Sequence, residues 1–527
     1  MTSSVISFSE VRKHGPLATT LWTVIGGKVY DVTAFRSMHP GGEELIDHVA
    51  GKDGSVAFTA VHVRVCALCC SANGDRACQP KDLAARMLPK ASLLGDADMA
   101  SRADGDVAPV YVNPSSSHSA PTGDKPTADT MLNAFDFEAV ARETLSAEAW
   151  GYYSSGADDE ITLRENHAAF HRVWLRPRVL IDVAKVDTST VMAGTKVALP
   201  VYLTATAMGK LAHPDGEQAI VRAAARRDVV YMLPTLSSCT LDEMLDARAD
   251  GQVLWSQLYV NSDRQRTKAY VEELHRRGVK ALFVTVDAPQ LGRREKDMRN
   301  KFKVGKAAEQ SESEAAADRD RGVARAISTF IDPSLSWKDL AWLQALSPMP
   351  VYLKGVQCAE DAVLALRAKC AGVVLSNHGG RQLDASRSAL EVLDEVMPAL
   401  RAEPGYTRGA FEVFIDGGVR RGADVFKALA MGASGVGVGR PVLYSLAAFG
   451  QAGVERMLHV IKEELEMVMQ LMGTRSVADI GSRHVITKDL ASHISATPRD
   501  FLSERTYERL QTQAERVGFG GAAKPRL

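Results

Sequence analysis

The 527-residue sequence has little of several features that mark specialised classes of protein. It contains seven cysteines, a small and odd number that argues against a disulfide framework and for a reducing compartment. It contains no apolar run of about 18 residues, so no membrane span is expected. Neither sign of charge is in excess, with 63 Lys and Arg against 64 Asp and Glu, so nucleic-acid binding is not expected.

What is present divides the chain into two domains. Residues 1–100 form a module with its own apolar positions. Residues 101–128 are rich in Pro, Ser, Thr and Gly and lack an apolar period, which predicts a linker. The rest of the chain forms a larger domain.

Eight short apolar and β-branched runs alternate with helix-like segments in the larger domain. They cover residues 199–207, 229–236, 252–260, 280–289, 350–356, 371–379, 411–419 and 434–440. Eight buried strands separated by helices predict an α/β fold, a (β/α)8 TIM barrel, with a doubly wound parallel sheet as the alternative. Polar residues end most of these runs. A barrel gathers its site at all its strand ends, whereas an open sheet uses one switch point, so the barrel is favoured.

The segment SNHGGRQLD at 376–384 carries the most informative chemical pattern. His378 and Arg381 lie three residues apart on a glycine-flanked turn after a predicted strand. Imidazole exchanges a proton near neutral pH and guanidinium binds a carboxylate, so the pair suits a small carboxylic acid as substrate. Asp287, at another strand end, could fix the tautomer of a catalytic histidine. The alternatives are a loop histidine, a surface arginine and a helix-capping aspartate.

A buried lysine and two glycine-rich turns predict an anionic ligand. Lys354 lies in the apolar run VYLKGV, where its partner is either a negative ligand group or a structural salt bridge. The segments DGGVRRG and GVGVGRP supply glycine-rich turns together with Arg420 and Arg440, as in the phosphate sites of barrels. Their spacing is not G-x-G-x-x-G, so a mononucleotide or phosphorylated ligand is favoured over a dinucleotide.

The motifs together resemble two known families. WTVIGGKVYDVTAF followed by HPGG is similar to the cytochrome b5 haem-binding domain, an α+β fold. YYSSGADDE, SQLYVNSDR, VTVDAPQLGRREKDMR, FIDPSLSWKD, LKGV, SNHGGRQLD and DGGVRRG resemble the FMN-dependent 2-hydroxyacid dehydrogenase and oxidase family. This second resemblance covers residues 129–506 and leaves 507–527 as a tail. The joined order is typical of the flavocytochrome b2 family, which implies FMN and haem b as cofactors.

The resemblance implies a role for each motif residue. His378 would take the proton released in the oxidation, and Asp287 would support the charge that it gains. Tyr152 and Arg381 would bind the carboxylate of the substrate, and Tyr259 would contact its hydroxyl. Arg294 would lie close to the mouth of the active site. The flavin ring would be held by Ala205, Thr206, Ala207, Gln257, Thr285 and Lys354. The ribityl chain and phosphate would be held by Asp416, Gly417, Gly418, Arg420, Gly439 and Arg440. The haem iron would be ligated by His39 and His62, although HPGG alone is usually an ordinary turn.

Two departures from the family pattern affect these expectations. Pro234 stands where the family often has Ser or Thr, which would remove one hydrogen bond to the flavin. Residues 63–79 read as an insertion after His62, before a helix expected over 80–95. The insertion contains Cys66, Cys69, Cys70 and Cys78. It is interpreted as a surface insertion, with a zinc site or a retained intron as alternatives.

The expected function is oxidation of a small L-2-hydroxy acid, with L-lactate to pyruvate as the first choice. Electrons would pass from FMN through haem b to a cytochrome c-like acceptor. Ala207, Leu236 and Ile331 are expected to form an apolar wall that suits a short side chain. The rival functions are an oxidase that uses O2 and makes H2O2, and a non-catalytic haem electron carrier.

The assembly and location of the protein are further expectations. The resemblance implies a homotetramer. Residues 1–10 show neither a secretory signal nor an Arg-rich transit pattern, so the expected location is the cytoplasm. The mitochondrial intermembrane space and the peroxisome are the alternatives.

Overall fold

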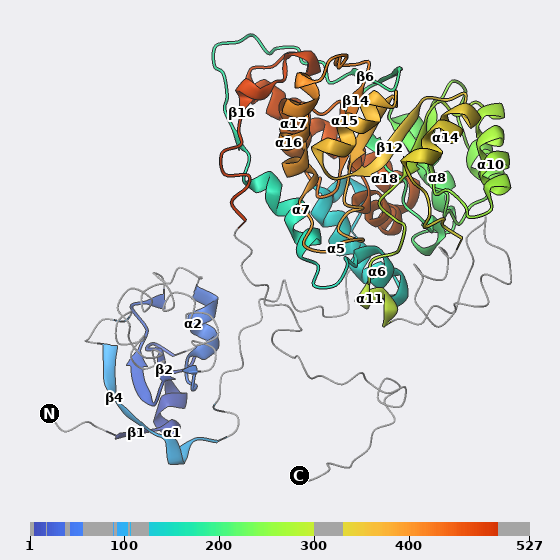
Figure 1. The fold of residues 1–527 in the computed structure, drawn as a ribbon. Coiled ribbons are helices and arrows are strands. Elements are labelled where there is room, and N and C mark those ends of the chain that lie inside the picture. Colours follow the sequence, from blue (N-terminus) through green and yellow to red (C-terminus); the bar gives the residue numbers. More distant parts are fainter. Residues whose placement is uncertain are drawn as a thin grey trace, which may run out of the picture. The chain divides into compact units, whose positions relative to one another are not determined.

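The structure, a computed structural model, forms two compact units, residues 1–125 and 126–527 (Figure 1). The residues that it describes are 5–16, 18–36, 43–55, 88, 92–103, 106, 126–299 and 330–493. The predicted haem ligands His39 and His62, the cysteines of the 63–79 insertion and the tail lie outside the described residues.

The first unit is built on a four-stranded mixed sheet. Its strand order is β1 (Val5–Ser7), β4 (Leu93–Asp98), β3 (Lys28–Asp31) and β2 (Trp22–Ile25). β2 and β3 form a hairpin through Gly26 and Gly27, whose φ values of 58° and 79° favour glycine. Its α-helices in the described residues are α1 (Phe8–Val11) and α2 (Glu43–Val49).

The helix expected over 80–95 is wrong at its carboxyl end. Leu93 begins β4, which pairs in parallel with β1 and antiparallel with β3. These pairings join residues far apart in the chain, and such tertiary contacts override a local helical pattern.

The second unit is a closed barrel of eight parallel strands (Figure 1). The strands are β8 (Val201–Leu203), β9 (Val230–Leu233), β10 (Leu254–Leu258), β11 (Leu282–Thr285), β12 (Val351–Val356), β13 (Gly372–Leu375), β14 (Glu412–Asp416) and β15 (Gly435–Val438). Each lies inside one of the eight predicted runs, and β15 pairs with β8 to close the ring. The predicted TIM barrel is therefore confirmed, and the doubly wound alternative is wrong.

At least one helix follows every barrel strand, and all of these helices except the short one at Glu295–Met298 cover the outside of the sheet (Figure 1). In chain order these helices are α8 (Gly216–Arg226), α9 (Leu241–Asp246), α10 (Arg264–Arg276), α11 (Glu295–Met298), α14 (Leu340–Leu346), α15 (Ala359–Arg367), α16 (Ala389–Ala402), α17 (Gly422–Met431) and α18 (Arg440–Met472). Capping boxes begin α9 at Thr240 and α16 at Ser388, each with a glutamate three residues later. No described helix has the length and apolar content needed to cross a bilayer.

Shorter elements complete the second unit. Three helices precede the barrel: α5 (Ala134–Thr144), α6 (Ala147–Ser154) and α7 (Ile161–His171). Two small antiparallel ribbons pair β6 (Thr190–Met192) with β7 (Thr195–Val197), and β5 (Trp174–Leu175) with β16 (Val485–Ile486).

The barrel interior has an aromatic layer beneath a polar layer. Five buried aromatic side chains from different strands pack together, namely Tyr202, Trp255, Phe283, Tyr352 and Phe414. Side chains alternate along a strand, so the residue two positions further on points to the same side. Those residues are Thr204, Gln257, Thr285, Lys354 and Asp416. The buried aromatic layer therefore lies directly beneath a polar layer at the carboxyl ends of the strands.

Candidate active site

A cavity of about 570 Å³ lies at the carboxyl ends of the barrel strands. Every barrel residue that the sequence analysis placed at the substrate or flavin lines it, except Asp287, which lies behind His378. These predicted lining residues come from the end of each of the eight strands or from the loop that follows, and Tyr152 comes from α6. Barrel closure thus brings together side chains that are far apart in the sequence.

His378 is held between an acid and a phenol. Its Nδ1 lies 3.0 Å from Oδ1 of Asp287, and its Nε2 lies 3.1 Å from the hydroxyl of Tyr259. His378 has a left-handed backbone with φ of 60°, stabilised by a 3.0 Å bond from its N–H to Oγ of Ser376. Burial lowers the pKa of His378, although Asp287 acts in the opposite direction. The imidazole is therefore neutral near pH 7 and able to accept a proton.

Asp287 is a buried carboxylate that stays ionised. Burial alone would raise the pKa of Asp287, but the hydrogen-bonded contact with His378 and the charge of Lys354 outweigh burial and lower it. Its second oxygen, Oδ2, has no hydrogen-bond partner among the described residues. Asp287 therefore provides a fixed negative charge directly behind the base.

Two arginines make one wall of the cavity basic. Arg381 donates from Nη1 to the main-chain oxygens of Tyr152 and Ser155, at 2.7 and 2.9 Å. Its guanidinium also lies 5.0 Å from the centre of the Tyr152 ring. Arg294 is buried beside it and donates from Nε to the main-chain oxygen of Arg381 at 3.1 Å. Burial and the neighbouring Arg381 charge lower the pKa of Arg294 to about 9, so an anion bound here would stabilise both cations.

The polar layer contains a buried ion pair. Nζ of Lys354 lies 3.0 Å from Oδ2 of Asp416 and 3.2 Å from Oγ of Ser376. Burial would lower the pKa of Lys354, but Asp416 and Asp287 offset it and raise the pKa. The lysine therefore keeps its positive charge inside the barrel.

Amide and hydroxyl groups extend the polar layer. Nε2 of Gln257 donates to Oγ1 of Thr285 at 2.9 Å, and its Oε1 accepts from the N–H of Thr235 at 3.1 Å. Oγ1 of Thr206 is buried in the cavity wall and has no partner among the described residues. These groups can donate hydrogen bonds to a planar heterocycle and accept hydrogen bonds from it.

Glycines and arginines form the other end of the cavity. Gly417 and Gly418 have φ values of 96° and 81°, which favour glycine. A Cβ on Gly418 would lie 1.9 Å from the main-chain oxygen of Asn166, so the turn packs directly against α7. Arg420 pairs with Glu138 at 3.3 Å, and the guanidinium of Arg440 donates to three main-chain oxygens. Both arginines line the cavity and provide positive charge for a phosphate.

The cavity, its histidine base and its phosphate end agree with the comparisons to known proteins. The FMN-dependent dehydrogenase family matches residues 141–487. The chain belongs to the FMN-dependent dehydrogenase family. Residues 7–97 match the cytochrome b5-like heme/steroid binding domain.

Individual relatives cover both domains or the barrel alone. "L-lactate dehydrogenase (cytochrome)" of Wickerhamomyces anomalus is 43% identical over 95% of this chain and 83% of its own. "Glycolate oxidase 1" of Zea mays is 43% identical over 70% of this chain and 98% of its own. A variant of flavocytochrome b2 with pyruvate bound is 45% identical, has a TM-score of 0.64 and matches 73% of this chain and 93% of that chain.

The residues of the cavity fit the FMN of this dehydrogenase family. The buried ammonium, the Gln257 amide and the orphaned Thr206 hydroxyl suit the polar edge of a flavin ring. The glycine turns with Arg420 and Arg440 suit its single phosphate. The predictions of FMN and of an FMN-dependent dehydrogenase are confirmed, and the match over 7–97 confirms the haem b prediction.

Several residues of the dehydrogenase cavity were missed by the sequence analysis. Asn166, His167 and His171 of α7 line it, as do Phe135 and Glu138 of α5. Nothing in the sequence indicated that these helices, which precede the barrel, cover the phosphate end. Their polar residues have the spacing of an ordinary surface helix.

The predicted apolar wall is correct in part. Ala207 and Leu236 line the main cavity, but Ile331 lines a second cavity of about 230 Å³ instead. The reason is that Ile331 pairs with Asn261 in an isolated antiparallel β-bridge, which places it with Leu335 and Leu340 in the lining of the second cavity. Pro234 also lines the main cavity and offers neither an N–H nor a hydroxyl there.

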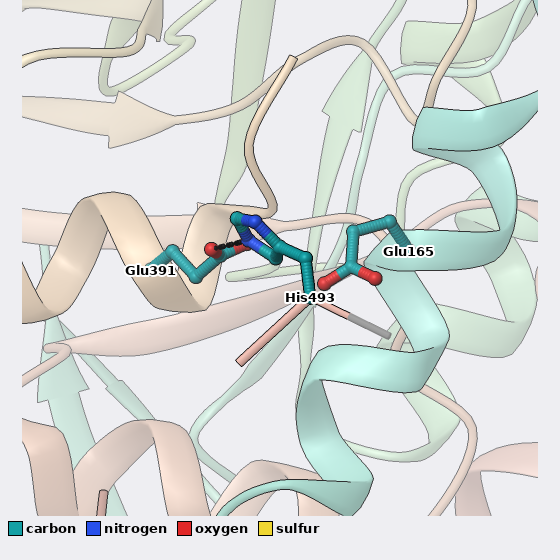
Figure 2. Close-up of side chains that lie close together, drawn as sticks. All are labelled: Glu165, Glu391 and His493. Atoms are coloured by element: carbon teal, nitrogen blue, oxygen red, sulfur yellow. Dashed lines mark hydrogen bonds and ion pairs between the residues drawn. The ribbon is translucent and has the colours of Figure 1, made fainter. Parts of the chain in front are cut away.

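One group of potential metal ligands lies apart from the active site of the dehydrogenase domain. Glu165, Glu391 and His493 have ligand atoms close together, and they come from α7, the start of α16 and the segment after β16 (Figure 2). Both oxygens of Glu165 already pair with Arg172, and Glu391 accepts from Ser388 and pairs with His493. Arg172 also donates to the main-chain oxygen of Leu490 at 2.9 Å. The group therefore anchors the end of the described chain.

Proposed function

We propose that the protein oxidises L-lactate to pyruvate in the barrel and passes the electrons through its N-terminal domain to a cytochrome c-like acceptor. The observation that carries the proposal is the position of His378, between Asp287 and Tyr259 and on the same cavity as Arg381. A base next to a carboxylate-binding cation is what oxidation of a 2-hydroxy acid requires. FMN in the barrel supplies a two-electron acceptor, and haem b supplies a one-electron relay.

The substrate carboxylate binds at the basic wall. Nη1 of Arg381 is fixed by two main-chain oxygens, so the guanidinium cannot rotate away when a ligand binds. The rest of this planar group remains for the carboxylate, where paired hydrogen bonds give orientation as well as affinity. Tyr152 packs against Arg381 and places its ring along the same wall. Arg294 adds a second, buried positive charge.

The proton released in the oxidation goes to Nε2 of His378. Its Nδ1–H is donated to Asp287, which fixes the tautomer that leaves Nε2 free to accept. The Tyr259 hydroxyl, 3.1 Å from Nε2, marks where the oxygen on the substrate's C2 would bind. The imidazolium that forms is stabilised by the fixed charge of Asp287.

The polar layer would hold the flavin ring and favour electron transfer to it. Lys354 supplies a buried positive charge, and Asp416 neutralises only part of its field. A positive charge beside the ring site stabilises a reduced, anionic ring. Gln257 and Thr285 hold each other and therefore present a preorganised edge.

The size of the substrate is set by the apolar wall. Ala207 and Leu236 line the same cavity as the base, and an apolar wall of this kind suits a short side chain such as a methyl group. A related flavocytochrome b2 structure holds pyruvate, the product of lactate oxidation, which supports this choice.

The test is an absorption spectrum before and after anaerobic addition of L-lactate to the full-length protein. The proposal predicts bleaching of the flavin band together with reduced b-type haem bands. Bleaching of the flavin band without reduced haem bands would show that haem does not accept the electrons. If the flavin band does not bleach, lactate is refuted as the substrate.

The rival function is a 2-hydroxyacid oxidase, favoured by the 43% identity of the barrel to maize glycolate oxidase. The lactate-reduced protein is mixed with cytochrome c or with O2 in a stopped-flow instrument. The proposal expects reoxidation to be much faster with cytochrome c. Faster reoxidation by O2, with stoichiometric H2O2, would establish the oxidase instead.

The homotetramer and the cytoplasmic location remain part of the proposal. An apolar group of exposed side chains on the β5–β16 ribbon, the segment after it and the end of α18 supports self-association, namely Trp174, Leu180, Leu471 and Ile486. Light scattering of the purified protein would test the tetramer, and cell fractionation would test the location.

A further inference from the structure

Gln382 lies next to Arg381 in the loop after β13, and its side chain is buried. Its Nε2 donates to the main-chain oxygens of Asp287 at 2.8 Å and Gln290 at 2.9 Å. Its Oε1 accepts from the N–H of Gly292 at 3.2 Å and from Nη2 of Arg294 at 3.1 Å. One amide therefore contacts four groups of a single loop, the one that follows β11.

The orientation of this amide is determined by its partners. Carbonyl oxygens only accept and N–H groups only donate, so a flipped Gln382 would make none of the four bonds correctly. All four of its hydrogen-bonding positions are used. These bonds also give a hydrogen-bond partner to backbone groups that are buried between the loops and cannot reach water.

The two loops joined by Gln382 carry the reactive groups. The β13 loop carries His378 and Arg381, and the β11 loop carries Asp287 and Arg294. The loops approach so closely that a Cβ on Gly292 would lie 2.3 Å from the main-chain oxygen of Gln382. Gln382 therefore lies where the loop that carries the base contacts the loop that carries its acid.

We propose that Gln382 is a positioning residue that aligns Asp287 with His378 and Arg294 with Arg381. This inference rests on the proposed function, because it concerns the same base and the same carboxylate site. Gln382 itself does not line the cavity, so it contacts neither the substrate nor the flavin site.

A misaligned Asp287 would change the acid limb of the profile of kcat/KM against pH. His378 is neutral when it acts, so kcat/KM rises with pH through its pKa. The groups that act on it are Asp287, which raises the pKa, and Lys354 and Arg294, which lower it together with burial. Weaker contact with Asp287 therefore moves the acid limb to lower pH while kcat falls. A loss of folded protein would lower the rate without moving the limb.

The experiment compares Gln382→Met with native protein, using the full-length holoenzyme and L-lactate. Methionine fills a similar volume and makes none of the four hydrogen bonds. We expect unchanged FMN content, a fall in kcat of about 10- to 100-fold and a shift of the acid limb to lower pH. The matched control is Gln252→Met. Gln252, on the loop before β10, donates to the main-chain oxygen of Val221 in α8 and accepts from the N–H of Ala249, away from the cavity. The control is expected to keep the native profile.

The outcomes separate the two proposals. Native protein that fails to reduce its flavin with lactate refutes the proposed function. Native protein that works, with a Gln382→Met variant of native kcat and native acid limb, overturns the positioning role alone. If Gln382→Met does not fold, Gln382→Glu is used. The glutamate can still accept from Gly292 and Arg294, but its second carboxylate oxygen faces the two main-chain carbonyl oxygens and is repelled by them. A kcat for this variant equal to that of native protein would equally overturn the inference.

Discussion

Replacement of Asp287 by asparagine keeps the shape of the side chain and removes its charge. Oδ1 of Asp287 lies 3.0 Å from Nδ1 of His378, and its side chain is 2% exposed. When His378 takes a proton, this carboxylate is the counter-charge hydrogen-bonded to it. Removing one partner of a buried pair costs about 3–5 kcal/mol, and each 1.36 kcal/mol is about tenfold in rate. The expected loss in kcat is therefore about 1,000-fold.

The assay is steady-state oxidation of L-lactate with cytochrome c, at equal FMN content measured by absorbance. The asparagine amide can also donate to Nδ1, which would place the proton on Nε2 and block the base. Asp332→Asn is the matched control: Asp332 is a buried carboxylate paired with Arg264 at 2.6 Å, on the second cavity. It should retain kcat within about twofold. A kcat for Asp287→Asn within tenfold of native would refute the electrostatic role.

Two further predictions concern the carboxylate wall and the glycine turn. Arg381→Lys cannot form paired hydrogen bonds with a carboxylate, so kcat/KM for lactate should fall about 100-fold with FMN retained, whereas Arg387→Lys should leave it unchanged. Equal values for the two variants would contradict the carboxylate role. Gly418→Ala places a Cβ 1.9 Å from Asn166 O at a φ of 81°, so the free energy of unfolding should fall by at least about 2 kcal/mol. Gly481→Ala, where nothing lies within 4 Å of the new Cβ, is the control, and denaturant titrations that give equal stability would contradict the packing.

The barrel was predictable because its strands are buried on both faces and read as continuous apolar runs. Runs such as 350–356 and 411–419 stand out against amphipathic helices, and their polar ends mark the edge at which a barrel gathers its site. Asp287, Lys354 and His378 could be found from this pattern alone.

The missed residues depend on contacts between distant segments. Asn166 and Asn377 exchange amide hydrogen bonds of 2.8 and 2.7 Å across 211 positions, and no local pattern marks such a pair. The α7 residues at the phosphate end were missed for this reason. Ile331 was misplaced because its position depends on the route of the chain after β11, which the residue type does not determine. Leu93 entered a strand because it pairs with Tyr30 of β3.

The most direct test of the central claim is the rate of flavin reduction by L-lactate under anaerobic conditions in a His378→Gln variant. Glutamine keeps a polar side chain of similar reach but cannot accept a proton at neutral pH. The account predicts normal FMN absorbance and flavin bleaching at least about 1,000-fold slower than in native protein. Bleaching at the native rate would show that His378 is not the base and would contradict the account.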